Sequence, residues 1–274
     1  MHRTLAIAHL TFLEARRRRI VPAAVLGGLL FLLVFGTSLY LITQRNPIIG
    51  PQKQAVSLFI ALAGLYVANF LTIAAAVLLP LDTLSGEIAS GTMQTLASKP
   101  VHRAEILLGK WLAFCAMITA YFALTGGGIL LIVRVLTGFT PQNIGLAMPL
   151  LLLGAALMLT VTMAGGSRLT TVTNGIVAFA FYGIAFIGGW VEQIGTLASA
   201  DSARYIGTAI SLVSPVDALW RRAAYELQPP LTRGIQIGPF GTPNVPSDAM
   251  IAWAIAFCVL MLAIALRQFQ RRPL

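Results

Sequence analysis

Charged residues are scarce in this 274-residue chain: lysine, arginine, aspartate and glutamate make up 10% of it, against 57% for apolar residues. Soluble domains carry about 25% charged residues, so the composition excludes an ordinary soluble globular protein. Cysteine is rarer still. Cys115 and Cys258 both lie inside apolar runs, without a CxxC pattern or a neighbouring histidine, which argues against a disulfide framework or a zinc site.

Sequence patterns for catalysis are missing as well. The chain has no G-x-x-x-x-G-K-[ST] phosphate loop and no HExxH, and its three histidines, His2, His9 and His102, are far apart in sequence. Neither a pair of acids inside an apolar run nor a serine–histidine arrangement is visible. We therefore expect no catalytic residue, no metal ligand and no nucleotide site of its own, and we expect that the protein is not an enzyme.

Long apolar runs are what the chain has instead. About 20 apolar residues cross the roughly 30 Å hydrocarbon core of a bilayer as one α-helix. Six such runs predict an all-α, multi-pass membrane protein with a single transmembrane domain over residues 1–274. The expected spans cover about 20–43, 56–80, 105–137, 146–165, 169–190 and 249–266.

Basic residues predict the orientation. Lysine and arginine concentrate at the N-terminus, in the segment 81–110, at Arg168 and in the C-terminal tail. By the positive-inside rule, both termini and the 81–104 segment are expected in the cytoplasm, and 191–248 outside, for a protein of the inner (plasma) membrane. The net charge of +10 is explained by these span ends and by anionic headgroups, so no nucleic-acid partner is expected.

Two segments outside the spans have a helical pattern. Residues 1–19 end in four consecutive arginines and predict an interfacial helix on the anionic leaflet; a frayed basic tail is the alternative. Within 191–248, the helical apolar spacing breaks at Pro215 and is followed by a loop rich in glycine and proline. Either two short helices re-enter the outer leaflet, or they lie wholly in the external phase, and both interpretations stay open here.

A polar hairpin, LDTLSGEIASGTMQTLASKPVHRAEILLGK, separates the second and third spans. Ser85 suits a helix N-cap, with Glu87 in the first turn, where an acid matches the helix dipole. Pro100 then breaks the chain before a second helix that carries Glu105 in its first turn. A polar helix–break–helix between two spans needs a soluble partner to dock against.

This hairpin resembles the signature of type-2 ATP-binding-cassette exporter permeases: an acid, then Gly-Thr, then a proline–basic–Ile-Leu-Leu-Gly-Lys run. The matching residues are Glu87, Gly91, Thr92, Pro100, Arg103, Ile106, Leu107, Leu108, Gly109 and Lys110. The six-span layout, the basic N-terminal helix with Glu14 and the SPVDALWR stretch also fit, so the resemblance covers nearly the whole chain. Among the branches, the chain looks most like permeases related to the one that serves nitrous oxide reductase maturation.

The resemblance implies a subunit that forms a homodimer and pairs with two separate ATPase subunits, which bind ATP and magnesium. The 81–104 hairpin would couple to the ATPase, spans two and five would line the dimer seam and the path, and 191–248 would form an outer gate. We expect Glu87 to pair with a basic ATPase residue; a solvated acid at a helix start is the alternative. The expected coupling residues are Ser85, Glu87, Gly91, Thr92, Met93, Leu96, Pro100 and Arg103.

Polar residues inside the spans are candidates for a substrate path, because they are costly in lipid and usually face protein or water. Interhelical hydrogen bonding is the alternative for each of them: Asn69, Thr72, Tyr121, Asn174 and Tyr182. Without a mid-membrane acid or base, an apolar or amphipathic substrate suits the path better than an ion. Two other functions remain open: an ATP-driven subunit that acts on an external partner protein in assembly or maturation, and an ATP-independent channel or scramblase.

Overall fold

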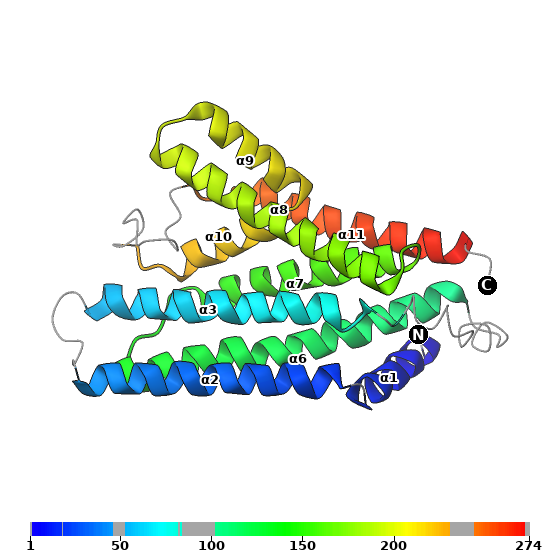
Figure 1. Ribbon diagram of the computed structural model, residues 1–274, viewed down its shortest axis with the longest axis horizontal. Helices are drawn as coiled ribbons and strands as arrows, with labels where there is room; N and C mark the ends of the chain where they lie inside the picture. The colour runs from blue at the N-terminus through cyan, green and yellow to red at the C-terminus, as the bar shows by residue number, and fades with distance from the viewer. Residues whose placement is uncertain are drawn as a thin grey trace.

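The computed structural model describes residues 2–17, 19–45, 53–81, 83, 102–230 and 244–271. In these ranges the chain is all-helical, which confirms the predicted fold class, and six of its helices are long and apolar enough to cross a membrane. Figure 1 shows their arrangement. The helices are α1 (His2–Arg17), α2 (Ile20–Arg45), α3 (Lys53–Leu78), α6 (Arg103–Thr137), α7 (Ile144–Gly166), α8 (Thr171–Leu197), α9 (Asp201–Val213), α10 (Val216–Leu227) and α11 (Asp248–Arg271).

The long helices α2, α3, α6, α7 and α11 run roughly along one axis, and both chain termini lie at the same end of the bundle (Figure 1). We call this the termini end and the opposite one the far end. α7 packs against α3, α6, α8, α10 and α11 and is the central helix of the bundle. Its side chains at Leu157, Met158 and Leu159 are completely buried, so the core forms on all sides of α7.

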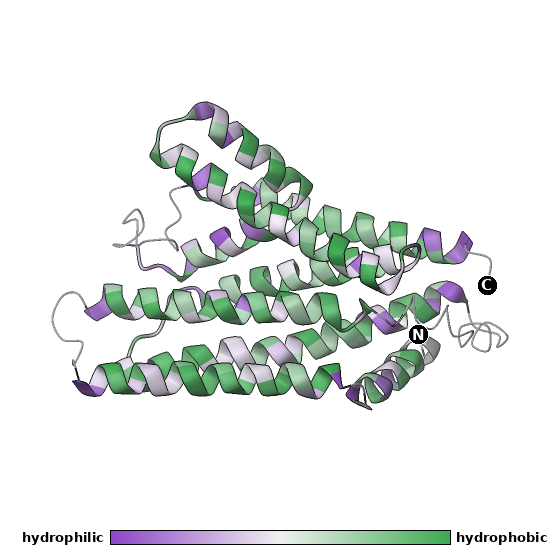
Figure 2. Ribbon diagram, viewed as in Figure 1, coloured by the Kyte–Doolittle hydropathy of each residue, from purple (hydrophilic) through white to green (hydrophobic). Residues whose placement is uncertain are grey.

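The outer surfaces of the long helices are apolar (Figure 2). α2 is the extreme case, because only 6% of its most apolar stretch is buried within the chain. Leu26, Leu30 and Leu33 are each more than 60% exposed. Such a surface is unstable in water and suits either acyl chains or another apolar protein surface.

The first helix, α1, packs across the start of α6. Gly109 of α6 leaves room for α1, since a Cβ there would collide with Ile7 and with the carbonyl oxygen of Thr4. Leu5 and Leu10 lie on the other side of α1 and are 58% and 62% exposed. With 35 residues, α6 is about 52 Å long, which exceeds the roughly 30 Å core of a bilayer, and α1 packs on the surplus length.

Helices α9 and α10 are attached to the bundle in different ways. α9 folds back along α8 as a hairpin that diverges from the long helices (Figure 1). Gly207 makes this close approach possible, because a Cβ there would meet the backbone of Glu192. α10 packs into the bundle, with Val216 and Leu219 against Gly154, the midpoint of α7. α8 continues to Leu197, beyond the expected end of the fifth span, and its last turns carry the contacts with α9.

Candidate functional site

Most of the residues predicted to couple to an ATPase lie outside the described part of the chain. They are Ser85, Glu87, Gly91, Thr92, Met93, Leu96 and Pro100. The two flanks of the hairpin are described. On one side, the backbone N–H of Thr83 donates to the carbonyl of Pro80 at 3.0 Å. On the other side α6 begins after His102, whose backbone N–H donates to the Glu105 carboxylate at 3.1 Å. An acid at this position satisfies an N–H group that the helix itself leaves unpaired.

Further contacts connect helix ends next to this hairpin. Arg103, the one predicted coupling residue that is described, donates from Nη1 to the carbonyl of Gln270 at 3.3 Å. Ser167, in the turn between α7 and α8, has its Oγ 2.6 Å from Oε1 of Gln268. The start of α6, the α7–α8 turn and the end of α11 therefore form one connected surface at the termini end.

The five predicted path residues do not form a single cluster. Asn174 of α8 is buried and donates to the carbonyl of Thr162 at 2.9 Å. Thr72 is also buried, and its hydroxyl donates to the carbonyl of Ala68 within its own helix at 2.7 Å. Interhelical or intrahelical hydrogen bonding thus accounts for these two side chains.

The other three path residues lie on different helices. The Tyr182 ring of α8 is 6.1 Å from the ring of Phe70 on α3. Asn69 is buried on the same helix as Phe70. Tyr121 is buried on α6 and lines an apolar cavity near the termini end. α3, α6 and α8 each contribute to the set, and the role of these residues as a path stays a prediction.

A buried charge cluster, which was not predicted from the sequence, joins α8, α9 and α10. Arg221 of α10 is only 1% exposed. Its Nη2 lies 2.8 Å from Oε2 of Glu192 on α8, and its Nε lies 3.0 Å from Oδ2 of Asp217, one turn earlier on α10. Ser211 of α9 accepts from Nη2 of Arg221 at 3.2 Å, and Asn244 donates to the other oxygen of Glu192. One guanidinium thus links three helices.

Burial determines the electrostatics of this cluster. It raises the pKa of Asp217 from 3.8 to about 6; Arg221 opposes the shift, and the negative charge of Glu192 adds to it. Two carboxylates share one cation, and Nη1 of Arg221 has no hydrogen-bond partner among the described residues. Removing one member of a buried pair leaves an uncompensated charge and costs about 3–5 kcal/mol. The cluster is therefore stable only while all three helices stay together.

A second set of ion pairs connects an adjacent face of α10 to the rest of the bundle. Arg222 lies 3.1 Å from Glu226 and 2.9 Å from Asp248, the first residue of α11. Asn143, which precedes α7, donates to the other oxygen of Glu226 at 3.1 Å. α10 is thus held by charges on two faces, toward α8 and α9 through Arg221 and toward α7 and α11 through Arg222.

A sequence signal for both sets exists. Asp217 and Arg221 are four residues apart, as are Arg222 and Glu226, which is the spacing of ion pairs on one helix. The partner of Arg221 on α8 carries no such signal, because Glu192 is separated from it by 29 residues. Only the packing of α8 against α10 brings these two residues together.

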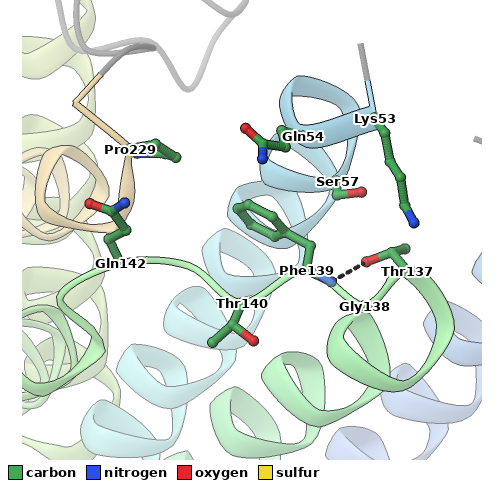
Figure 3. A pocket seen from close by; sticks show the side chains of 9 residues that line it. All are labelled: Lys53, Gln54, Ser57, Thr137, Gly138, Phe139, Thr140, Gln142 and Pro229. Atoms are coloured by element: carbon green, nitrogen blue, oxygen red, sulfur yellow. Dashed lines mark hydrogen bonds between the residues drawn. The ribbon is translucent and has the colours of Figure 1, made fainter. Parts of the chain in front are cut away.

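A polar pocket of about 410 Å³ opens at the far end, between the start of α3, the end of α6 and the end of α10 (Figure 3). Gly138 adopts a left-handed conformation (φ 71°) and ends α6, and the Phe139 N–H donates to the Thr137 hydroxyl at 3.2 Å. Among the described residues of its lining, Lys53 is the one that carries a charge, so the pocket can accommodate a neutral polar or an anionic group. The lining is Lys53, Gln54, Ser57, Thr137, Gly138, Phe139, Thr140, Gln142 and Pro229.

Comparison with known proteins assigns the chain to a family. A family model described as ABC-2 family transporter protein matches residues 5–274, nearly the whole length. No curated protein matches the chain in sequence. The six apolar helices agree with the family assignment and make this a multi-pass membrane protein. The chain belongs to the ABC-2 transporter family and is a membrane permease of the ATP-binding-cassette type.

Proposed function

We propose that this chain is the permease subunit of an ATP-driven exporter and works as a homodimer with two separate ATPase subunits, which bind ATP and magnesium. The observation that carries the proposal is the family match over residues 5–274. ATP hydrolysis would then occur in the partner, and this chain would have no nucleotide site of its own. Its substrate would be apolar or amphipathic, because the five predicted path residues are uncharged.

In this proposal the hairpin 81–104 carries the coupling helix and the termini end faces the ATPase. Two contacts support a rigid docking surface there: Arg103 with the Gln270 carbonyl, and Ser167 with Gln268. Movement of the hairpin would be transmitted directly to α3 and α6, because the hairpin connects the end of α3 to the start of α6. Glu87 would pair with a basic residue of the ATPase, and Met93 and Leu96 would fill an apolar groove on it.

The orientation in the inner (plasma) membrane follows from the same arrangement. We infer that the termini end is cytoplasmic, because Arg16, Arg19, Arg103, Arg168 and Arg271 all belong to it. The far end is then external, and the pocket at Lys53 opens outside. In this orientation α9 and α10 lie between the fifth and sixth spans on the external side.

We further propose that α9 and α10 form the outer gate and that the Arg221 cluster holds it closed. α10 reaches the midpoint of α7 at Gly154, which supports re-entry into the outer leaflet. Charges at that depth are expensive in lipid and are usually functional. Because the cluster links α10 to the fifth span, α8, movement of α8 would break or re-form its ion pairs.

Two finer assignments belong to the same proposal. We propose that the chain belongs to the branch that resembles the nitrous oxide reductase maturation permease. In that branch the ATP-driven motion could act on an external partner protein instead of a solute. The external α9–α10 segment would then be the contact surface. An ATP-independent channel or scramblase is the remaining alternative.

The test is co-purification of the chain with its ATPase, followed by an ATPase assay of the eluate. Wild type is compared with Glu87→Arg and with Asp201→Arg, a charge reversal at a residue of the far end that is 74% exposed. We expect an ATPase to co-purify with wild type and with Asp201→Arg, and to be lost or uncoupled in Glu87→Arg.

Other outcomes lead to other functions. If no ATPase binds the folded protein in any form, the exporter proposal fails, and passive flux or lipid scrambling in liposomes becomes the measurement. If ATPase turnover responds to an external protein and to no apolar solute, the assembly function replaces export.

A further inference from the structure

An apolar cavity of about 290 Å³ lies where α1, α2, α3 and α6 meet, toward the termini end. Its wall includes Val21 and Ala24 of α2 and Met117 and Ala120 of α6. Leu124, also in the wall, is 38% exposed, so the cavity opens onto the outer apolar surface of the bundle and is not sealed inside it.

Water is a poor occupant for this cavity. Its volume corresponds to about ten water molecules, and apolar cavities of this kind stay dry or bind apolar ligands. An acyl chain that enters from the surrounding leaflet would instead bury apolar surface on both sides. The volume and the apolar lining therefore favour a flexible hydrocarbon chain.

A cation marks one edge of the cavity. Arg16, near the end of α1, contributes to the lining and forms no ion pair with any other described residue. It is the first of four consecutive arginines. A guanidinium binds a phosphate through two parallel hydrogen bonds, so the edge of the cavity suits an anionic headgroup.

We propose that an anionic phospholipid of the cytoplasmic leaflet binds here, with one acyl chain between α1, α2, α3 and α6 and its phosphate at Arg16. A soluble anion would use the arginine and leave the apolar cavity empty, whereas a neutral lipid would fill the cavity and leave the arginine unused. The leaflet assignment rests on the orientation proposed above. The site itself does not depend on an ATPase partner.

The position of the site suggests what the lipid does. The cavity is bounded by α1, and α1 packs on α6 at Gly109, the seventh residue of α6. The hairpin 81–104 leads directly into that start. A lipid that fills the space behind α1 would support this contact and fix the angle at which α1 crosses α6.

The experiment is native mass spectrometry of the purified chain, released from micelles that contain equal amounts of phosphatidylglycerol and phosphatidylcholine with the same acyl chains. We expect wild type to retain phosphatidylglycerol in preference. Arg16→Gln should lower this preference about fivefold, which is the change in binding that one arginine contributes near an anionic leaflet. Arg19→Gln is the matched control, because Arg19 belongs to the same arginine run and does not line the cavity.

Filling the cavity tests the acyl chain. Ala120→Phe should lower the retention of both lipids severalfold, whereas Ala116→Phe, one turn away on the exposed surface of α6 and outside the lining, should leave it unchanged. Ala24→Leu is the substitute variant if Ala120→Phe fails to fold.

Equal retention of the two lipids by wild type would overturn the proposal. So would an Arg19→Gln effect as large as that of Arg16→Gln, or unchanged binding in both filled variants. Co-purification of the ATPase, measured in parallel, reports separately on the proposed function.

Discussion

Arginine is used in opposite ways in two regions of this protein. In the cluster between α8, α9 and α10, Arg221 is 1% exposed and is paired with two carboxylates of the same chain. Near the termini end, Arg16 and Arg19 are exposed and pair with no described residue. A cation away from water needs partners within the protein, while an exposed one can bind ligands outside it. The first region holds helices together, and the second is available to lipid or to another protein.

The largest effect that would test this comparison is the loss of Arg221. In Arg221→Ala, Glu192 and Asp217 face each other without a cation, so we expect a loss of about 3–5 kcal/mol in stability. Thermal unfolding in detergent measures it. Arg19→Ala is the control and should unfold at the wild-type temperature. Equal melting temperatures for Arg221→Ala and wild type would mean that the cluster does not hold α8 and α10 together.

The pH dependence of stability gives a smaller effect. Because burial raises the pKa of Asp217 from 3.8 to about 6, the folded protein binds a proton more tightly than the unfolded chain between these values. The stability gained from this proton is complete below about pH 4 and is lost as the pH rises through about 6. A shift of about two pKa units corresponds to roughly 3 kcal/mol at most.

The measurement for this second prediction is the melting temperature at pH 7 and pH 5. Wild type should gain stability at pH 5, and Asp217→Asn should lose most of that gain because its amide does not titrate. Asp201→Asn is the control, since Asp201 is exposed. The same rise in wild type and in Asp217→Asn would assign the titration to another group.

The smallest effect is expected for an ion pair that is exposed. Arg204 lies 3.3 Å from Asp201 on α9, and the two side chains are 48% and 74% exposed. Exposed pairs contribute about 0.2–1 kcal/mol, so Arg204→Ala should lower the melting temperature far less than Arg221→Ala. A comparable loss in the two variants would show that the pairing of the charges, and not their burial, makes the difference between the two regions.

Much of the fold was predictable because a bilayer selects for apolar length. The six spans have 23 to 35 residues as helices in the structure, and a local window of sequence contains all that is needed to find them. α8 shows the limit of prediction from apolar length. Its predicted end at residue 190 follows the apolar run, but the helix continues to Leu197, because packing against α9 stabilises turns that carry Glu192.

The candidate site was less predictable. Of the five expected path residues, Asn174 and Thr72 have hydrogen-bond partners that only the fold identifies. The coupling residues from Ser85 to Pro100 lie outside the described residues and stay a prediction. The charge cluster was missed, because Glu192 lies beyond the predicted end of the fifth span and 29 residues from Arg221.

The amino-acid sequence by itself determined that this chain is an all-α membrane protein of the ABC-2 family, because apolar length and the hairpin motif are local properties. Tertiary structure alone decided that Arg221 meets Glu192, that α10 packs against the midpoint of α7, and that four helices enclose a cavity beside Arg16. These features join residues that are distant in sequence. Which of them meet depends on how whole helices pack, and no local pattern encodes that.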